Sequence, residues 1–277
     1  MVVFPNCKIN IGLRIVRKRP DGYHDLDTVF HPIDLYDVLE VIENRGDAQK
    51  EINYSSSGLQ LDDRENNLCT RAYQLLKKDF PDLPGVQMHL HKAIPIGAGL
   101  GGGSADAAFT LKLLNEKFNL QLSTDRLLDY ALQLGSDCPF FIINKTCHAT
   151  GRGEKLEPVN INLSGYKIIV VNPGIHINTG LAFAGIVPAP AAKTISEVIQ
   201  QPPASWRNEL FNDFEATIFP RYADIAEIKN KLYDQGAIYA SMSGTGSTVY
   251  GIFEKTAAVH NSFPAHYFYK DLSGQPH

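Results

Sequence analysis

The chain has few cysteines, a single tryptophan and no long hydrophobic run. Its 277 residues include four cysteines, and none of these forms a CxxC pair or a His/Cys cluster with zinc spacing. A disulfide framework and a structural metal are therefore not expected, and the cysteines are predicted to be reduced thiols. The N-terminal apolar stretch, residues 2–4, is too short for a signal-peptide core, and no apolar run approaches a membrane span. These absences predict a cytoplasmic protein with no membrane partner.

Neither sign of charge is in large excess. The formal net charge is -4, which gives no electrostatic reason to expect a nucleic-acid partner. Hydrophobic residues make up 44% and charged residues 20% of the chain, and this ordinary globular composition argues against disorder, coiled coil and collagen-like repeats. The length allows one large domain or two modest ones. We predict two domains, residues 1–155 and 156–277.

The first half of the chain mixes strand and helix patterns. Apolar and polar residues alternate over residues 7–16, which predicts a half-buried strand. An Asp21-Gly22 turn then leads into β-rich sequence at 26–41. The further predicted elements are an amphipathic helix at 66–80, a short strand at 87–91, a helix opened by Ser104, a helix at 123–134 stopped by Gly135, and a strand at FFII, residues 140–143.

The second half opens with the run YKIIVVN, residues 166–172, which predicts a central strand. Residues 187–203 hold four prolines and predict a loop-rich segment with a short helix near Ile195. A helix is expected at 223–233, and a hairpin at 237–253 around the turn Gly-Thr-Gly-Ser. Since strands and helices alternate without a βαβ rhythm, the predicted fold class is α+β.

A glycine-rich stretch, PIGAGLGGGSADAA, precedes good helix-forming sequence. Five of the seven residues from Gly97 to Gly103 are glycine. Bare backbone at a helix N-terminus suits a phosphate, because the first amides lack internal partners and lie at the positive end of the helix dipole. No lysine precedes Ser104, so the stretch is not a Walker loop, and its overlap with GxGxxG is weak evidence for a dinucleotide site. A tight connection that touches no ligand would need fewer glycines.

Four ordered motifs resemble those of the GHMP kinases, a family of small-molecule kinases. They are KINIGLRIVRKRPDGYHDLDTVF near the start, the glycine-rich stretch, LGSDCPFFI, and MSGTGSTVYGIF near the end. The first and third are similar to one branch, whose members phosphorylate a small alcohol carrying a cytidine diphosphate group. The resemblance runs from Lys8 to about Phe253 and implies a two-domain fold with an N-terminal mixed β/α nucleotide-binding domain and a ferredoxin-like C-terminal domain that closes the substrate cleft.

The resemblance implies an enzyme that uses ATP and Mg²⁺. It places the ATP phosphates on the loop formed by Pro95, Ile96, Gly97, Ala98, Gly99, Leu100, Gly101, Gly102, Gly103, Ser104 and Ala105. Ser104 is a candidate helix N-cap, a candidate Mg²⁺ contact, or both. Ala105 and Asp106 stand where many relatives carry a second Ser and Asn or Asp, so a Mg²⁺ contact falls to Ser104, to water or to Asp106.

Lys8 and Asp137 are the predicted catalytic residues. Asp137 follows a helix end in GSDCP; alone it would be a turn or capping residue, but the motif favours a base that takes the substrate hydroxyl proton. Lys8 alone would be a solvated strand residue, and the family pairs it with the aspartate. Three uses remain open for its charge: holding Asp137 ionised, lowering the pKa of the hydroxyl, and neutralising the moving phosphoryl group.

Tyr23 and His24, which follow the DG turn, are the predicted cytosine-binding residues. An aromatic ring can stack on a base and a histidine can bond its edge, although without the resemblance both would be ordinary surface residues. Asn10 and Thr179 match substrate-contacting positions, with His176 a weaker neighbour. Gly244 and Gly246 of the late hairpin let backbone approach the substrate or the first loop, or they only form the turn.

The predicted activity is ATP-dependent phosphorylation of a cytidine diphosphate-bearing alcohol by a monomer or homodimer. A kinase of the same family for another alcohol, such as homoserine or a sugar, is the first alternative; the DGYH stretch disfavours it, because such substrates have no base to stack. A non-catalytic nucleotide-binding relative is the second, and the presence of both Lys8 and Asp137 argues against it. A Rossmann dehydrogenase is a distant third.

Overall fold

The chain divides into two compact units, each assembled from separate stretches of sequence. A computed structural model describes residues 1–44, 51–60, 67–188 and 193–272. Unit 1 comprises Met1–Cys7, Leu35–Ile96 and Gly101–Lys145, and unit 2 comprises Lys8–Asp34, Gly97–Leu100 and Thr146–His277. The division into an ATP-binding and catalytic domain at residues 1–155 and a C-terminal domain at 156–277 stays a prediction.

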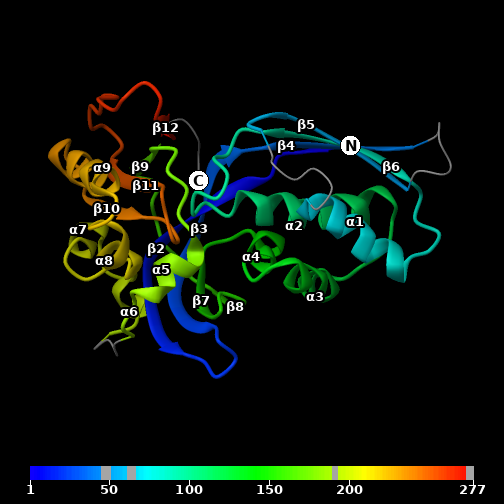
Figure 1. The fold of residues 1–277 in the computed structure, drawn as a ribbon, viewed down its shortest axis with the longest axis horizontal. Helices are drawn as coiled ribbons and strands as arrows, with labels where there is room; N and C mark the ends of the chain where they lie inside the picture. Colours follow the sequence, from blue (N-terminus) through cyan, green and yellow to red (C-terminus); the bar gives the residue numbers. More distant parts are fainter. Residues whose placement is uncertain (45–50, 61–66, 189–192, 273–277) are drawn as a thin grey trace. The chain divides into compact units, whose positions relative to one another are not determined.

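Unit 1 is a sheet covered by helices. Its strands are β1 (Val2–Val3), β4 (Val38–Glu43), β5 (Ile52–Gly58) and β6 (Val86–Lys92), and its helices are α1 (Leu68–Asp79), α2 (Gly102–Lys117), α3 (Thr124–Leu134) and α4 (Cys138–Ile143). The strand order is β1-β4-β6-β5, with β5 parallel to β6 and the other pairs antiparallel. Figure 1 shows α1 and α2 along one face of this sheet and α3 and α4 beyond them.

Unit 2 contains two further sheets. One, with the order β2-β3-β7-β8, consists of β2 (Asn6–Lys18), β3 (His24–Tyr36), β7 (Cys147–Gly151) and β8 (Lys155–Pro158); β2 begins and β3 ends in unit 1. The other is fully antiparallel, with the order β10-β11-β9-β12, and consists of β9 (Tyr166–Asn172), β10 (Tyr239–Met242), β11 (Val249–Glu254) and β12 (Phe268–Asp271). The short helices are α5 (Thr179–Ala184), α6 (Ile195–Val198), α7 (Pro203–Trp206) and α8 (Phe214–Ile218), and the long one is α9 (Ala223–Asp234).

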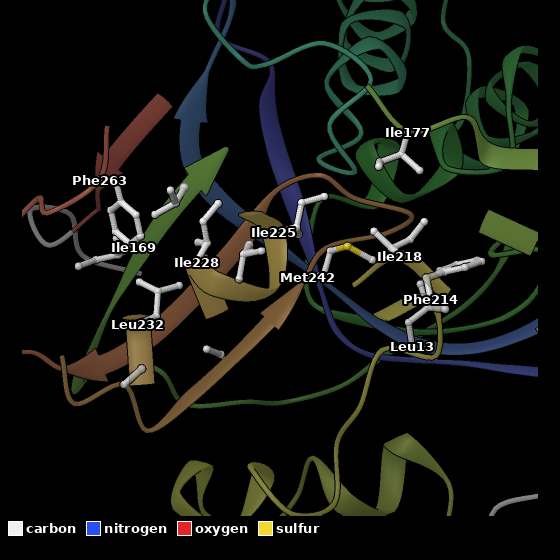
Figure 2. Packing of buried hydrophobic residues seen from close by; sticks show 14 of the residues in the cluster. Leu13, Ile169, Ile177, Phe214, Ile218, Ile225, Ile228, Leu232, Met242 and Phe263 are labelled. Atoms are coloured by element: carbon white, nitrogen blue, oxygen red, sulfur yellow. The ribbon is translucent and has the colours of Figure 1, made fainter. Parts of the chain in front are cut away.

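The β10-β11-β9-β12 sheet has the strand order of a ferredoxin-like fold. Helix α9 packs on it, and Figure 2 shows Ile225, Ile228 and Leu232 of this helix among the apolar side chains of β9 and β10. The connection from β11 to β12, residues 255–267, is entirely described and carries no helix. The unit therefore has the ferredoxin-like sheet with only one of its two usual helical crossovers.

Most predicted elements are confirmed. The structure contains the predicted helices as α1, α2, α3 and α9, the predicted strands as β6 and β9, the DG turn, and the hairpin of β10 and β11. Strand β9 is central, lying between β11 and β12. The helix near Ile195 is α6; residues 189–192 of the proline-rich segment lie outside the described residues. All four cysteines are buried.

Two local predictions are wrong. The FFII run is part of helix α4, with Pro139 in its first turn, where proline favours a helix start. All but the last of its six residues are buried, and a short run that is apolar on every side has no period to separate helix from strand. Strand β2 is not half-buried, because Lys8 and Asn10 on its polar side are only 3% and 2% exposed.

Candidate functional site

Lys8 of β2 is held inside unit 2 by polar contacts. Its Nζ atom donates hydrogen bonds to Asn10 Oδ1 (2.7 Å) and to the Gly99 carbonyl (3.2 Å), and it lies 5.0 Å from the ring centroid of Phe30. The Asn10 amide donates in turn to Thr28 Oγ1 (3.0 Å). Two residues apart on one strand, Lys8 and Asn10 share a face, as the sequence predicts. The ammonium group is therefore fixed in direction.

The glycine loop and the late hairpin meet at Gly99. The Ser243 hydroxyl donates to the Gly99 carbonyl (2.8 Å), and a Cβ atom on Gly99 would lie 1.9 Å from the Ser243 carbonyl oxygen. A Cβ atom on Gly244 would lie 3.1 Å from the Gly99 backbone. This approach of two backbones confirms one of the uses predicted for Gly244, and only glycine permits it.

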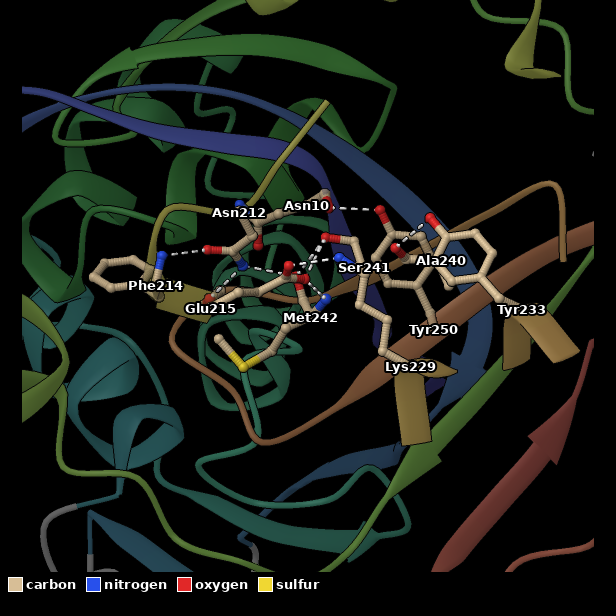
Figure 3. Close-up of polar contacts among 11 residues, drawn as sticks. Asn10, Asn212, Phe214, Glu215, Lys229, Tyr233, Ala240, Ser241, Met242 and Tyr250 are labelled. Carbon is tan, nitrogen blue, oxygen red and sulfur yellow. Dashed lines mark hydrogen bonds and ion pairs between the residues drawn. The ribbon is translucent and has the colours of Figure 1, made fainter. Parts of the chain in front are cut away.

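Polar side chains behind the hairpin fix its position, as Figure 3 shows. Asn212 donates to the carbonyls of Met242 (2.7 Å) and Gly244 (2.8 Å). Glu215 accepts a hydrogen bond from the Met242 backbone amide (2.8 Å). The same carboxylate is ion-paired with Lys229 (2.5 Å). The Tyr250 hydroxyl donates to the Asn10 carbonyl (2.8 Å), which ties β11 to β2. The turn that contacts Gly99 is therefore anchored by bonds to α8 and its neighbouring residues.

The predicted cytosine-binding residues lie beside two further side chains. His24 stacks on Phe183 of α5, with ring centroids 4.6 Å apart and an interplanar angle of 18°. Tyr23 is 55% exposed, and the guanidinium of Arg152 lies 4.8 Å from its ring centroid. Burial, with a smaller contribution from Lys18, lowers the pKa of His24, so the imidazole is neutral at pH 7 and offers one donor and one acceptor.

Thr179 and His176 are two exposed residues of unit 2. Thr179 is the first residue of α5, one turn before Phe183 on the same helix. His176 lies close to the first glycine of the loop, because a Cβ atom on Gly97 would be 3.3 Å from its Nδ1 atom. Unit 2 therefore gathers Lys8, Asn10, Gly97, Gly99, Tyr23, His24 and Thr179 within one compact body.

Unit 1 holds the remainder of the glycine loop at the start of α2. Gly101 is the N-cap residue in a left-handed conformation (φ 70°), and no side chain caps the helix there. Ser104 lies inside the first turn, so of its two candidate roles the N-cap is wrong. The three residues after the N-cap of an α-helix have amides without intrahelical partners, and this end of α2 suits an anion.

Asp137 begins helix α4 next to this turn. Its side chain makes no capping hydrogen bond. The structure therefore does not support the helix-capping role that the sequence left open for Asp137. Burial raises the pKa of the Cys138 thiol to about 12, against the lowering effect of the nearby Ser104 hydroxyl. Unit 1 thus places the start of α2 beside the residue that follows Asp137. Lys8 belongs to the other unit, and its pairing with Asp137 stays a prediction.

Asp106 is not an open metal ligand. Its side chain is 4% exposed, and one carboxylate oxygen bonds Lys92 Nζ (2.8 Å). Burial raises the pKa of Asp106 to about 7, against the lowering effect of the Lys92 ammonium. Among the residues that the structure describes, no group of three or more His, Cys, Asp or Glu side chains could hold a metal ion.

Phe183 and Lys92 were not singled out by the sequence analysis. Phe183 is signalled only by its spacing of four from Thr179 on a short helix. Lys92 is signalled by strand periodicity, because it falls on the same face of β6 as the buried residues Met88 and Leu90. A charged residue on an otherwise apolar strand face is the sequence pattern that would have identified Lys92.

Two family models match the chain. The GHMP kinases N terminal domain matches residues 67–145, and the GHMP kinases C terminal domain matches residues 194–267. Together with the relatives described next, these matches show that the chain belongs to the GHMP kinase family. A protein from Bacteroides fragilis named 4-diphosphocytidyl-2-C-methyl-D-erythritol kinase is 51% identical over 254 residues, which cover 91% of this chain and 92% of the relative. A protein of the same name from Azobacteroides pseudotrichonymphae is 50% identical over 257 residues, covering 92% and 94%.

Solved structures agree with the fold. A crystal structure of 4-(cytidine 5'-diphospho)-2C-methyl-D-erythritol kinase matches with a TM-score of 0.75 and 31% identity, covering 91% of this chain and 90% of that one. A homoserine kinase from Cytophaga hutchinsonii matches with a TM-score of 0.66 and 13% identity over 90% and 85%, which supports the fold alone. The two-domain α+β architecture predicted from the sequence is therefore confirmed. Membership of this family also implies the use of ATP.

Proposed function

We propose that the chain transfers the γ-phosphoryl group of ATP to the 2-hydroxyl of 4-diphosphocytidyl-2-C-methyl-D-erythritol. The observation that carries this proposal is a set of relatives that bear the name of that enzyme. They are 44–51% identical to this chain in alignments that cover more than nine-tenths of it. The buried, hydrogen-bonded Lys8 ammonium in unit 2 and the uncapped start of α2 in unit 1 supply the chemical groups that such a transfer needs.

In the proposed reaction, the 2-hydroxyl oxygen forms a bond to the γ-phosphorus and the bond from that phosphorus to the β-phosphate oxygen breaks, releasing ADP. Asp137 takes the hydroxyl proton, and Lys8 stabilises the negative charge that develops on the attacked group. The backbone amides around Gly99 to Gly103 bind the phosphates. Such a site works mainly by positioning and electrostatic stabilisation, so rigid support of these groups is the protein's main contribution.

The cytosine base is proposed to bind at the Tyr23, His24 and Phe183 side chains. The exposed Tyr23 ring offers a stacking surface, and the neutral His24 imidazole offers a hydrogen-bonding edge. Phe183 already stacks on His24 and keeps its ring oriented. Thr179 is proposed to contact the substrate from the start of α5, and Asn10 to contact it or to orient Lys8.

Mg²⁺ is proposed to enter with ATP. In such kinases the ion neutralises charge on the β- and γ-phosphates. Mg²⁺ is usually bound by few protein groups together with phosphate oxygens and water, so the lack of a carboxylate cluster among the described residues fits this role. Ser104, with its hydroxyl in the first turn of α2, is the residue we propose for contact with the ion or a phosphate.

We propose a cytoplasmic monomer or homodimer for the whole protein. Four buried cysteine thiols fit a reducing compartment. No helix within the described part of the chain is long and apolar enough to cross a membrane. We propose that residues 1–155 form the ATP-binding and catalytic domain and that residues 156–277 form the C-terminal domain.

A substrate panel tests the proposed function. The purified protein is incubated with Mg²⁺-ATP and, separately, with the cytidyl-diphospho alcohol, homoserine, galactose and mevalonate, while ADP release is followed. We expect turnover of the first alone. Turnover of homoserine or a sugar in its place would establish the alternative kinase, and nucleotide binding without turnover of any alcohol would establish the non-catalytic relative.

A further inference from the structure

Three buried charged residues meet in unit 1, outside the groups proposed for the chemistry. They are Lys92 at the end of β6, Asp37 just before β4, and Asp106 in α2, with side chains 2%, 0% and 4% exposed. The Lys92 Nζ atom is ion-paired with Asp37 Oδ2 and lies 2.8 Å from Asp106 Oδ2. Burial alone would lower the pKa of Lys92, but both carboxylates raise it, so the ammonium stays charged.

Asp37 connects this ammonium to the backbone that leads into the glycine loop. Its Oδ1 atom accepts the amides of Ala93 (2.7 Å) and Ile94 (2.9 Å). These are the first two residues after β6, and Pro95 follows them. The Asp37 carboxylate therefore binds the Lys92 ammonium and also the backbone amides that lead into the glycine loop.

Asp106 connects the same ammonium to α2. It lies four residues after Gly102, which is about 6 Å along the helix axis. A Cβ atom on Gly102 would be 3.0 Å from Lys92 Nζ, so the ammonium packs directly beneath the first residue of the helix. Lys92 thereby touches the start of α2 and is bonded one turn further along it.

The net charge of Asp37, Lys92 and Asp106 is not positive, so these side chains do not attract a phosphate electrostatically. One ammonium and two carboxylates give a net charge of -1, or zero when Asp106 is protonated. Tyr54 and Cys69 interact electrostatically with Asp106, and burial raises the pKa of each, so both stay neutral. Within the described residues the cluster brings no excess positive charge to the helix start, and its contribution must be geometric.

We propose that Asp37, Lys92 and Asp106 are positioning residues for nucleotide binding, which lock the end of β6 to the first turn of α2. The lock holds the amides of Gly102, Gly103 and Ser104 in the direction in which they bind phosphate. This inference rests on the proposed function, because it places the nucleotide phosphates at that turn. Amides at a helix start bind an anion well only when they converge on it, so a small tilt of the turn weakens binding without unfolding the helix.

The test compares Asp106→Leu with Asp106→Asn. Leucine removes the bond to Lys92, whereas the asparagine side-chain oxygen can still accept it. We expect Asp106→Leu to raise the Kd for ADP and the KM for ATP at least about tenfold and to leave the KM for the alcohol unchanged. We expect Asp106→Asn to stay within about threefold of the wild type for all three constants, since it keeps the acceptor.

Asp79→Leu is the matched control. Asp79, at the end of α1, accepts the Tyr130 hydroxyl (2.6 Å), so leucine there also removes a side-chain hydrogen bond from unit 1. We expect a lower Tm and an unchanged Kd for ADP. An Asp106→Leu protein that binds ADP like the wild type, or an Asp79→Leu protein that loses as much affinity, would overturn the proposal. Failure of the wild type itself to bind ADP would instead contradict the proposed function.

Hydrogen exchange of the wild type provides a measurement that needs no variant. If the turn is locked before the nucleotide arrives, the Ala105 amide, which donates to the Gly101 carbonyl (2.9 Å), exchanges slowly in the nucleotide-free protein. Exchange of this amide at the rate of an unstructured peptide, with protection gained only on adding ADP, would overturn the proposal even if Asp106→Leu did not fold.

Discussion

At the scale of single residues, Asp137 is the side chain on which the proposed chemistry depends most. We expect Asp137→Asn to lower kcat by about two to four orders of magnitude while ATP still binds, because the amide cannot accept the hydroxyl proton. Steady-state kinetics and calorimetric ATP binding measure the two effects. Asp129→Asn, at a 67% exposed side chain of α3, is the control and should match the wild type. A kcat for Asp137→Asn close to the wild type would leave Asp137 as a turn residue only.

Tyr23 tests the proposed base-binding surface. Its ring is 55% exposed and free to cover a base, so Tyr23→Ala should raise the KM for the cytidine substrate by about tenfold with a smaller effect on kcat. The KM for ATP should not change. Phe4→Ala, at an aromatic residue that is 57% exposed, serves as the control. An unchanged KM for the cytidine substrate would remove the stacking role.

The sequence carried the identities of these residues but not their surroundings. Lys8 and Asn10 were predicted to share the polar face of a half-exposed strand, and they do share a face. Their burial depends on Gly99 and Thr28, partners that strand periodicity does not specify. The same limit applies to Asp106, whose partner Lys92 is 14 residues away in sequence.

At the scale of elements, the contact between the glycine loop and the β10–β11 hairpin decides how the loop is held. We expect Gly99→Ala to lower the free energy of unfolding by more than about 1 kcal/mol, because its Cβ would overlap the Ser243 carbonyl and because φ is +79°. ATP affinity should fall with it. Thermal melts and nucleotide titration measure both effects.

Gly165→Ala is the matched control for that substitution. A Cβ atom on Gly165 meets nothing within 4 Å, so its Tm should stay within a degree or two of the wild type. A Gly99→Ala protein as stable as Gly165→Ala would show that the loop and the hairpin are not in contact.

The support behind the hairpin gives a second prediction at this scale. Asn212 is 2% exposed and bonds two carbonyls of the turn region, so Asn212→Ala should cost about 2 kcal/mol of stability or more. Chemical denaturation measures the loss. The exposed Asn208 provides the control Asn208→Ala, which should be nearly neutral. Equal stability of the two variants would contradict the anchoring role of Asn212.

Elements with clear periodicity were predictable and one without it was not. Helices α1 and α3 were predicted, and the structure shows their N-cap residues, Asn67 and Ser123. Strand β6 was also predicted, and buried residues alternate with more exposed ones along it. The prediction of a strand at FFII was wrong because a six-residue helix that is almost fully buried has no polar face to reveal its period. The contact of Gly99 with Ser243 joins residues 144 positions apart, and no local pattern encodes it.

At the scale of the whole molecule, the family assignment and the fold agree, and the two compact units each hold part of the predicted site. Lys8 and residues Gly97–Leu100 of the glycine loop belong to unit 2, while Asp137 and the start of α2 belong to unit 1. The chain passes between the units within the loop itself. Four motifs spread over about 245 residues identified the family, although the units that contain them are not continuous in sequence.

The central claim is that this chain phosphorylates the 2-hydroxyl of 4-diphosphocytidyl-2-C-methyl-D-erythritol. Phosphorus NMR of the reaction with Mg²⁺-ATP tests it most directly, because it identifies the product as well as the consumption of ATP. The account predicts one new phosphomonoester signal, coupled to the carbon that bears the 2-hydroxyl, in a one-to-one ratio with ADP. ADP with free inorganic phosphate and no new ester, or an ester at another hydroxyl, would contradict it.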